Sequence, residues 1–149
     1  MMKLLPIEKD ETLNKEFTNN PECIEILSVF RDLYLKVGFE KPWIGYFAKS
    51  EKNEITGVAG FKGKPKNGKV EISYGTFKKF QQKGIGTRLC KQLVLLSLKT
   101  NKKIRITART LPANNASTRI LKKNGFEFSG PVWDKEDGNV REWEYKRNP

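Results

Sequence analysis

The 149-residue sequence contains no histidine and only two cysteines, Cys23 and Cys90. The absence of histidine excludes a histidine general base, histidine metal ligands and every Ser/His or Cys/His nucleophilic arrangement. The cysteines lie far apart and fit neither a CxxC pair nor a secreted disulfide framework, which excludes a structural zinc site. Cys90 falls within an apolar helical pattern, so we interpret it as a small core residue and not as a reactive thiol.

Long apolar runs are also missing. No stretch approaches the roughly 20 apolar residues of a membrane span, and residues 1–10 lack a sustained apolar run of signal-peptide length. We therefore expect a cytoplasmic protein in a reducing compartment, with no membrane partner.

The chain has the length of a single domain, which we expect to span residues 1–149. Its apolar content of 37%, with nine Phe and three Trp, is sufficient for a packed core. Lys and Arg number 29 against 17 Asp and Glu, which gives a net charge of +12. Such a field attracts anions, so the excess indicates either an anionic partner or a solvated surface.

Hydrophobic periodicity predicts helix over 8–37, where one stripe of apolar side chains should face the core, followed by three strands at 43–49, 54–61 and 70–76. The Asn67-Gly68 pair predicts a tight hairpin between the second and third of these strands. The members of the helical stripe are Cys23, Leu27, Phe30, Tyr34 and Val37.

The second half of the chain alternates helices and strands. A helix over 84–100 separates the strand at 70–76 from an alternating strand at 103–109, which implies a right-handed crossover and parallel pairing. A short helix at 114–123 ends at Asn124-Gly125. Strands at 126–133 and 140–145 flank a second hairpin signal, Asp137-Gly138. The fold class is therefore α/β, with a mixed, mainly antiparallel sheet, a central parallel strand pair and flanking helices.

The segment QQKGIGT at residues 81–87 follows a strand and opens a helix. Its two glycines let the backbone approach a ligand closely, and free N–H groups at a helix N-terminus favour a phosphate. The segment is neither a Walker loop nor a dinucleotide fingerprint, because GxxxxGKS/T is absent and Leu89 stands where a third glycine would be. An anion cradle is the functional reading, and an ordinary glycine turn is the alternative.

Two segments together resemble the signature of the GNAT N-acetyltransferase superfamily. The strand EISYGT at 71–76, followed by 77–80 and Gln81-x-x-Gly84-x-Gly86, is similar to the family's acetyl-CoA motif Q/R-x-x-G-x-G/A. NNAS at 114–117, followed by ILKKNGF at 120–126, is similar to its second motif, N-x-x-S with a helix and Gly-Phe. The resemblance runs from about Trp43 to the C-terminus and is closest to the ribosomal-protein N-terminal (alanine/serine) acetyltransferases. It implies a single GNAT-like domain that uses acetyl-CoA as cosubstrate.

The resemblance also implies a role for each matching residue. Main-chain amides of residues 83–87 would hold the pyrophosphate, and the main chain of Thr76 would pair with the pantetheine arm. Asn114 would hydrogen-bond the same arm, while Lys83 and Lys123 would meet phosphates. The implied cofactor-binding set is Thr76, Gln81, Lys83, Gly84, Ile85, Gly86, Thr87, Asn114 and Lys123.

Acetyl transfer needs a neutral amine, so a base must remove a proton at neutral pH. A carboxylate is the leading candidate, and Glu71 stands where similar proteins of the subgroup carry a Glu implicated as that base. The wider superfamily often uses a Tyr as acid toward the thiolate, but Leu121 occupies that position, and the subgroup points to Ser117. The alternatives are that Glu71 is an exposed strand charge and that Ser117 satisfies free N–H groups at a helix start.

The sequence departs from the subgroup in two places. Gln82 stands where glycine is common, and the segment before Trp43, which forms the acceptor wall in related proteins, is short. The acceptor is therefore defined only as a primary amine, on a protein N-terminus or a small molecule. Aromatic side chains that could line its site, but are more simply core residues, are Trp43, Tyr46, Trp133, Trp143 and Tyr145.

Two other function classes stay open. A net charge of +12 is typical of a basic nucleic-acid-binding module, although no RNP, KH or helix-turn-helix signature is present. The second is a domain that binds acyl-CoA without catalysis. The oligomeric state is open between monomer and homodimer. Four lysines of the first hairpin read more simply as solvated than as a binding patch: Lys62, Lys64, Lys66 and Lys69.

Overall fold

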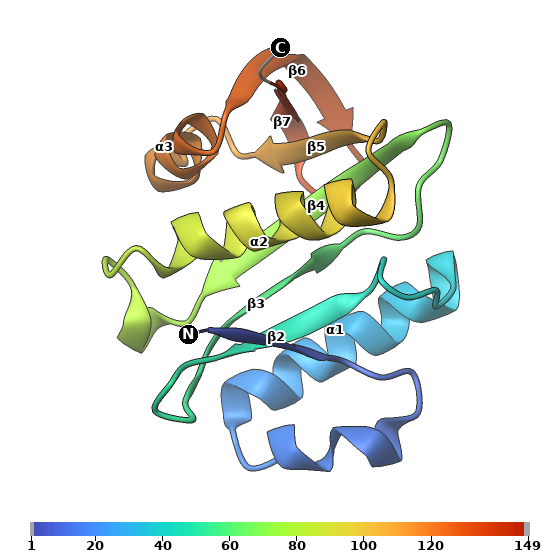
Figure 1. Cartoon of the computed structure of the whole chain (residues 1–149), viewed down its shortest axis with the longest axis vertical. Helices are drawn as coiled ribbons and strands as arrows, with labels where there is room; N and C mark the ends of the chain where they lie inside the picture. The colour runs from blue at the N-terminus through green and yellow to red at the C-terminus, as the bar shows by residue number, and fades with distance from the viewer. Residues whose placement is uncertain (1, 148–149) are drawn as a thin grey trace.

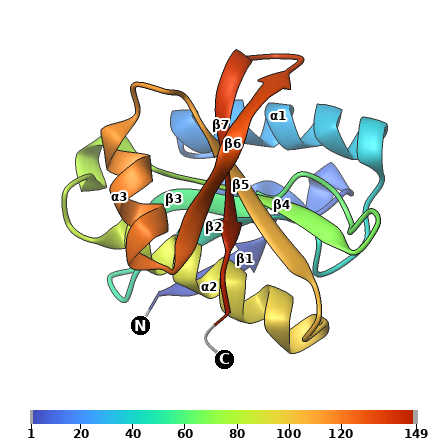
Figure 2. The ribbon, with the colours of Figure 1, turned by 90° about the horizontal axis from the view of Figure 1, so that it is seen from above.

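The computed structural model describes residues 2–147 as a seven-stranded sheet between two layers of helices (Figures 1 and 2). The strands lie in the order β1-β2-β3-β4-β5-β7-β6. They span β1 (Lys3–Pro6), β2 (Gly45–Lys49), β3 (Ile55–Phe61), β4 (Lys69–Thr76), β5 (Arg105–Thr110), β6 (Phe126–Asp134) and β7 (Gly138–Tyr145).

Helix α1 (Pro21–Val37) covers one face of the sheet, and α2 (Ile85–Thr100) covers the other, with α3 (Asn115–Lys123) beside it (Figure 2). Local signals set these limits. The side chain of Asn20 accepts a hydrogen bond from the N–H of Glu22, which caps the start of α1. Gly38, at a φ of 88°, lies just past its end. Two short 3-10 helices complete the set, η1 (Glu11–Phe17) and η2 (Lys78–Phe80).

One strand pair in the middle of the sheet differs from the others. β4 and β5 are parallel, with Lys69 opposite Arg105 and Ile72 opposite Ala108, while all other neighbours in the sheet are antiparallel. Helix α2 makes the crossover between them (Figure 1). The expected fold class, including the parallel pair at the centre of the sheet, is therefore confirmed.

The helical segment at 8–37 contains two helices, because η1 ends at Phe17 and Asn20 caps a second helix that begins at Pro21. One expectation for this segment was wrong. The helical stripe is shorter than expected, since Val37 is 37% exposed at the last turn of α1. Its other members are buried or packed against the core.

The core lies on both sides of the central strands. Leu89 and Leu93 of α2 are fully buried on one side, and Cys23 and Tyr34 of α1 are buried on the other. Most of the aromatic candidates are core residues, as the simpler interpretation held, since Trp43, Tyr46 and Trp143 are buried and Tyr145 packs against the core. Trp133 is the exception, at 71% exposed.

Candidate active site

A cleft opens where β4 and β5 separate. Their pairing ends at Ile72 and Ala108, yet β4 continues to Thr76 and β5 to Thr110. The first turn of α3 lies across this opening. The residues that line the cleft come from β3–β4, β5 and α3, namely Lys62, Glu71, Ile72, Ser73, Tyr74, Ala108, Arg109, Thr110, Ser117 and Leu121.

The edge of β4 that faces this cleft presents main-chain groups. The N–H of Phe77 donates to the carbonyl of Thr56 on the β3 side (2.9 Å). The alternation of an antiparallel ladder therefore turns the main-chain groups of Tyr74 and Thr76 toward the cleft. Gln81 donates its side-chain Nε2–H to the carbonyl of Thr76 (3.3 Å), which ties the motif's first residue to the strand. The main chain of Tyr74 is thus placed as a template for an extended ligand arm.

The segment before α2 forms a concave run of amides. Gln82 and Gly84 both adopt the left-handed conformation, with φ of 65° and 77°. Helix α2 begins directly after Gly84, and no side chain of a described residue caps that end. The N–H groups of the first helical turn, Ile85 to Thr87, are therefore directed at the loop mouth, where the helix dipole favours an anion. These groups fit a diphosphate, which supports the predicted cradle.

The two glycines of this motif have different surroundings. A Cβ at Gly84 would meet nothing within 4 Å, so this position combines a positive φ with an open approach. A Cβ at Gly86 would lie 2.8 Å from the Cδ1 atom of Ile120. The side chain of Ile120 on α3 therefore packs directly against Gly86 of α2.

A side chain of α3 brings the two motifs together. Asn124 donates its amide to the carbonyl of Thr87 (3.2 Å) and to that of Ile120 (3.0 Å). The C-terminal end of α3 therefore lies against the N-terminal turn of α2, and the exposed Lys123 is the residue that precedes this contact. Lys83 is exposed in the loop, with its Nζ atom 5.9 Å from the centre of the Phe80 ring.

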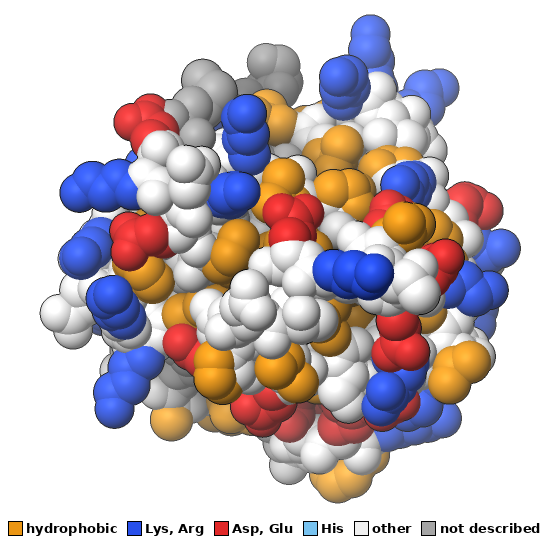
Figure 3. Space-filling view, turned by 90° about the horizontal axis from the view of Figure 1, so that it is seen from below, with side chains coloured by type: hydrophobic (Ala, Val, Ile, Leu, Met, Phe, Trp, Pro, Cys, Tyr) orange, Lys and Arg blue, Asp and Glu red, His pale blue; other side chains and the backbone are white. Residues whose placement is uncertain are grey.

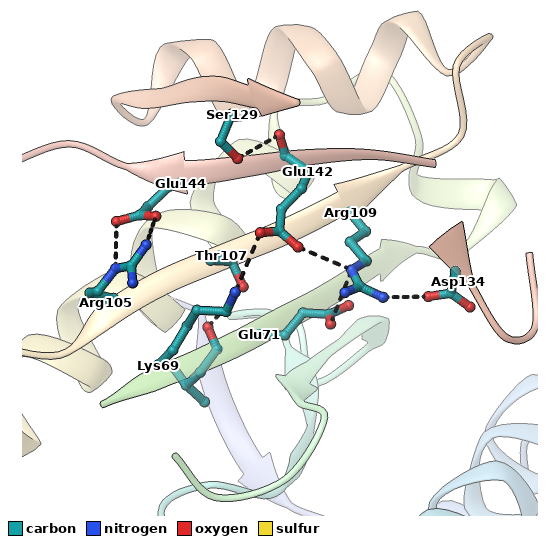
Figure 4. A network of polar contacts seen from close by, with 10 residues as sticks. Lys69, Glu71, Arg105, Thr107, Arg109, Ser129, Asp134, Glu142 and Glu144 are labelled. Carbon is teal, nitrogen blue, oxygen red and sulfur yellow. Dashed lines mark hydrogen bonds and ion pairs between the residues drawn. The ribbon is translucent and has the colours of Figure 1, made fainter. Parts of the chain in front are cut away.

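Glu71 projects on the face of the sheet opposite α2 and joins a charged network (Figure 4). Its carboxylate lies 3.0 Å from Lys62 Nζ and 3.7 Å from Arg109 Nε. Arg109 also contacts Glu142 (3.3 Å) and Asp134 (3.0 Å). The side chain of Glu71 is 21% exposed, so it is half-buried, and it lines the cleft. A carboxylate placed in this way can accept a proton from a group in the cleft, directly or through water.

Main-chain and side-chain hydrogen bonds hold Asp134 as an anion. The N–H of Glu136 and the guanidinium of Arg109 lower the pKa of Asp134 to about 2. The neighbouring carboxylates, with burial opposing them, leave the pKa of Arg109 raised. This part of the network therefore stays charged at neutral pH and fixes the side chain of Arg109 beside Glu71.

Ser117 lies on the first turn of α3 and lines the same cleft as Glu71. The cap of this helix is Asn114, whose Oδ1 atom accepts a hydrogen bond from the N–H of Ser117 (2.9 Å). The hydroxyl of Ser117 makes no hydrogen bond to another described residue. The cap of α3 is thus supplied by Asn114 and not by Ser117, which leaves open whether Ser117 is more than a residue of the first helical turn. The amide N–H groups of Asn114 remain available to a ligand.

The thiol of Cys90 is unsuited to covalent catalysis. It is buried beneath α2 against Tyr74, and burial raises its pKa to about 12. The thiolate is therefore absent at neutral pH, as the sequence interpretation expected. Burial likewise raises the pKa of Tyr74, so its hydroxyl stays protonated. No group of three or more His, Cys, Asp or Glu arranged to hold a metal occurs within residues 2–147.

Sequence analysis missed the charged network around Glu71. Arg109, which contacts Glu71, comes from β5, and its other partners Asp134 and Glu142 come from β6 and β7. Pattern alone gives no order for these strands. One signal existed, because parallel pairing puts Thr107 opposite Glu71 and so places Arg109 on the same face two residues further. Within the described part of the chain, no helix is long and apolar enough to span a membrane.

Comparisons with known proteins agree with this geometry. Residues 4–127 match the family model described as Acetyltransferase (GNAT) domain. The chain is 34% identical over 112 residues to "Uncharacterized N-acetyltransferase YjdG" of Bacillus subtilis, a match covering 72% of this chain and 65% of that protein. The matched segment therefore spans just under two thirds of this relative.

Solved structures share the fold at lower identity. The aminoglycoside acetyltransferase AAC(6')-Ib in complex with coenzyme A aligns with a TM-score of 0.70 at 21% identity, over 99% of this chain and 95% of that one. RimL, a ribosomal L7/L12 α-N-protein acetyltransferase in complex with coenzyme A, gives a TM-score of 0.68 at 18% identity, over 97% and 93%. A spermidine N-acetyltransferase SpeG chimera from Vibrio cholerae and hSSAT gives 0.69 at 12%, over 97% and 94%.

Proposed function

The chain belongs to the GNAT acetyltransferase family, and on this premise we propose that it transfers the acetyl group of acetyl-CoA directly to a primary amine. One observation carries the proposal. Glu71 and Ser117, predicted separately from the sequence as base and acid, line the same cleft between β4 and β5. That cleft leads along the β4 edge toward the amide cradle at the start of α2.

The residues present fit acetyl-CoA. The N–H groups of residues 83–87 would hold its pyrophosphate, with Lys83 and Lys123 as exposed cations nearby. The main chain of Tyr74 and Thr76 would pair with the pantetheine arm, and the amide of Asn114 would reach it from α3. When bound there, acetyl-CoA supplies a thioester whose carbonyl carbon accepts the amine.

Glu71 is proposed as the base that takes a proton from the attacking ammonium, directly or through water. Lys62 and Arg109 hold its carboxylate at the cleft mouth. Ser117 is proposed as the donor to the departing thiolate, because its hydroxyl lines the cleft and is not used to cap α3. Attack is direct, since the buried thiol of Cys90 cannot act as an intermediate nucleophile.

The acceptor is proposed to be a protein or peptide α-amine in preference to a small-molecule amine. Glu71, Ser117 and Leu121 all follow the pattern of the ribosomal N-terminal subgroup. We further propose that the enzyme consists of a single domain and is located in the cytoplasm, where its two free, buried cysteines would stay reduced.

The face around η1 and α1 does not support the nucleic-acid alternative. Basic side chains on this face lie mostly at its rim, with acidic and hydrophobic groups between them (Figure 3). A domain that binds acyl-CoA without turnover is the stronger rival, since it would share the cradle.

The deciding experiment incubates the protein with acetyl-CoA and a panel of peptides, amino acids, polyamines and aminoglycosides. Mass spectrometry of the acceptor and release of free coenzyme A give two independent readouts. The proposal expects an acetylated amine and an equal amount of coenzyme A. Tight binding of acetyl-CoA with no acetylated product from any acceptor would favour the non-catalytic domain.

A further inference from the structure

A large cavity lies beside the proposed active site, and most of the charged residues in its lining are basic. Its volume is about 640 Å³, within the range of about 300 to 1,000 Å³ that ligand pockets occupy. The walls come from the end of α1, the β3–β4 hairpin, β5 and β7. Its charged lining residues are Lys36, Lys62, Lys64, Lys66, Lys69, Arg109, Glu71 and Glu142.

This lysine cavity opens onto the catalytic cleft. Lys62, Glu71 and Arg109 line both spaces, so the proposed base stands at the boundary between them. The cleft side holds Ser117 and the β4 edge, where the thioester arm is proposed to lie. An acceptor whose amine reaches Glu71 from the other side would therefore extend its remaining atoms into the lysine cavity.

The positive charge of the lysine cavity is not neutralised by its own walls. Three of its cations are engaged by carboxylates, since Lys62 contacts Glu71, Lys69 contacts Glu142 (3.4 Å), and Arg109 contacts both and Asp134. The other three make no ion pair with any described residue: Lys36, Lys64 and Lys66. The cavity is lined by six cationic side chains and two carboxylates. Asp134, which contacts Arg109 from outside the lining, brings the number of nearby carboxylates to three.

We propose that the acceptor is the α-amine of an acidic peptide segment, whose carboxylates near the N-terminus pair with Lys36, Lys64 and Lys66. The inference rests on the proposed function and names its substrate class. An excess of like charge repels polycations such as spermidine or an aminoglycoside, while it attracts a chain of carboxylates. On this proposal the hairpin lysines select the acceptor, whereas the simpler interpretation of the sequence leaves them merely solvated.

The test uses the full chain and three peptides that share an N-terminal alanine, followed by three glutamates, three glutamines or three lysines. We expect kcat/KM for the glutamate peptide to exceed that for the glutamine peptide by about tenfold, a difference that shrinks as salt screens the charges. The lysine peptide and spermidine should be poorer than the glutamine peptide. Equal values for the three peptides, or a preference for polycations, would overturn the inference.

Charge reversal locates the preference. Lys64→Glu/Lys66→Glu should abolish the glutamate-over-glutamine ratio, or invert it. The matched control Lys15→Glu/Lys91→Glu changes the net charge equally at exposed positions that do not line the cavity, and should keep the ratio. A ratio that survives in the first variant, or is lost in the control, would contradict the assignment to this cavity.

A binding measurement separates this inference from the proposed function. If no acceptor of the panel is acetylated, the proposed function fails. Fluorescence anisotropy of the labelled glutamate peptide still reports on the cavity, with the Lys64→Glu/Lys66→Glu variant expected to weaken binding about tenfold relative to the control. Binding that does not change would overturn the inference on its own.

Discussion

The Nε atom of Arg109 lies 3.7 Å from the Oε1 atom of Glu71, so the proposed base is held beside a guanidinium that two other carboxylates also contact (Figure 4). Glu142 lies 3.3 Å from the same Nε atom, and Asp134 lies 3.0 Å from Nη1. Because these carboxylates come from β7 and β6, the last hairpin of the chain helps to orient a group on β4.

Asp134 gives this network a pH dependence. Its pKa, lowered to about 2 in the folded protein, is about 3.9 in an unfolded chain. The ionised carboxylate therefore stabilises the fold fully above about pH 4, and this contribution is lost as pH falls toward 2. We expect Asp134→Asn to be less stable than the parent at pH 6 and similar to it at pH 2, measured by urea unfolding. An equal difference at both pH values would contradict the assignment.

Gly84 allows the amide cradle to be tested by charge alone. Asn and Asp both tolerate a positive φ, and a Cβ at this position meets nothing within 4 Å. Gly84→Asp should lower the affinity for acetyl-CoA about tenfold more than Gly84→Asn, because only the first adds a negative charge beside the phosphates. Calorimetric titration measures both. Equal affinities would remove the cradle from the account.

Substitutions of Asn114 and Ser117 should affect stability and turnover differently. Asn114→Ala removes the cap of α3 and should lower the free energy of unfolding by about 1 kcal/mol. Ser117→Ala keeps the capped N–H, so its stability should match the parent while its turnover falls. The loss should be smaller than that caused by removing the base, since water can replace the hydroxyl. The assignment fails if Ser117→Ala is destabilised as much as Asn114→Ala.

Direct transfer predicts that no acetylated enzyme forms. Burial raises the pKa of Cys90 to about 12 and that of Cys23 to about 11, so neither thiol is ionised at neutral pH. Intact-protein mass spectrometry after incubation with acetyl-CoA alone should show the unmodified mass, and Cys90→Ala should retain turnover. An acetylated Cys90 would instead indicate a covalent intermediate.

Most of the fold could be read from periodicity and turn residues. The helix at 85–100 and its flanking strands could be predicted because the spacing of apolar residues changes at Gly84 from a strand period of 2 to a helical period of 3.6. The helix between the two strands then implied a crossover connection, which predicted the parallel pair. The 3-10 helix η2 at Lys78–Phe80 could not be predicted, because so short a 3-10 turn leaves no repeating apolar pattern.

The site was predictable only in part. Main-chain motifs such as residues 81–87 have a local signature, so the cradle followed from sequence. The partners of Glu71 depend on which strands are neighbours, and on β7 lying between β5 and β6, which no local pattern encodes. The role of Gly86 was also hidden, because its neighbour Ile120 lies on another helix.

The most direct test of the account is the effect of Glu71→Gln on turnover and on binding, measured on the same preparation. Turnover of the best acceptor at neutral pH should fall by about 10² to 10⁴, the contribution of a positioned base, while calorimetry should show nearly unchanged affinity for acetyl-CoA. Full turnover in Glu71→Gln, or a loss explained by weaker acetyl-CoA binding, would contradict the assignment of Glu71 as the base.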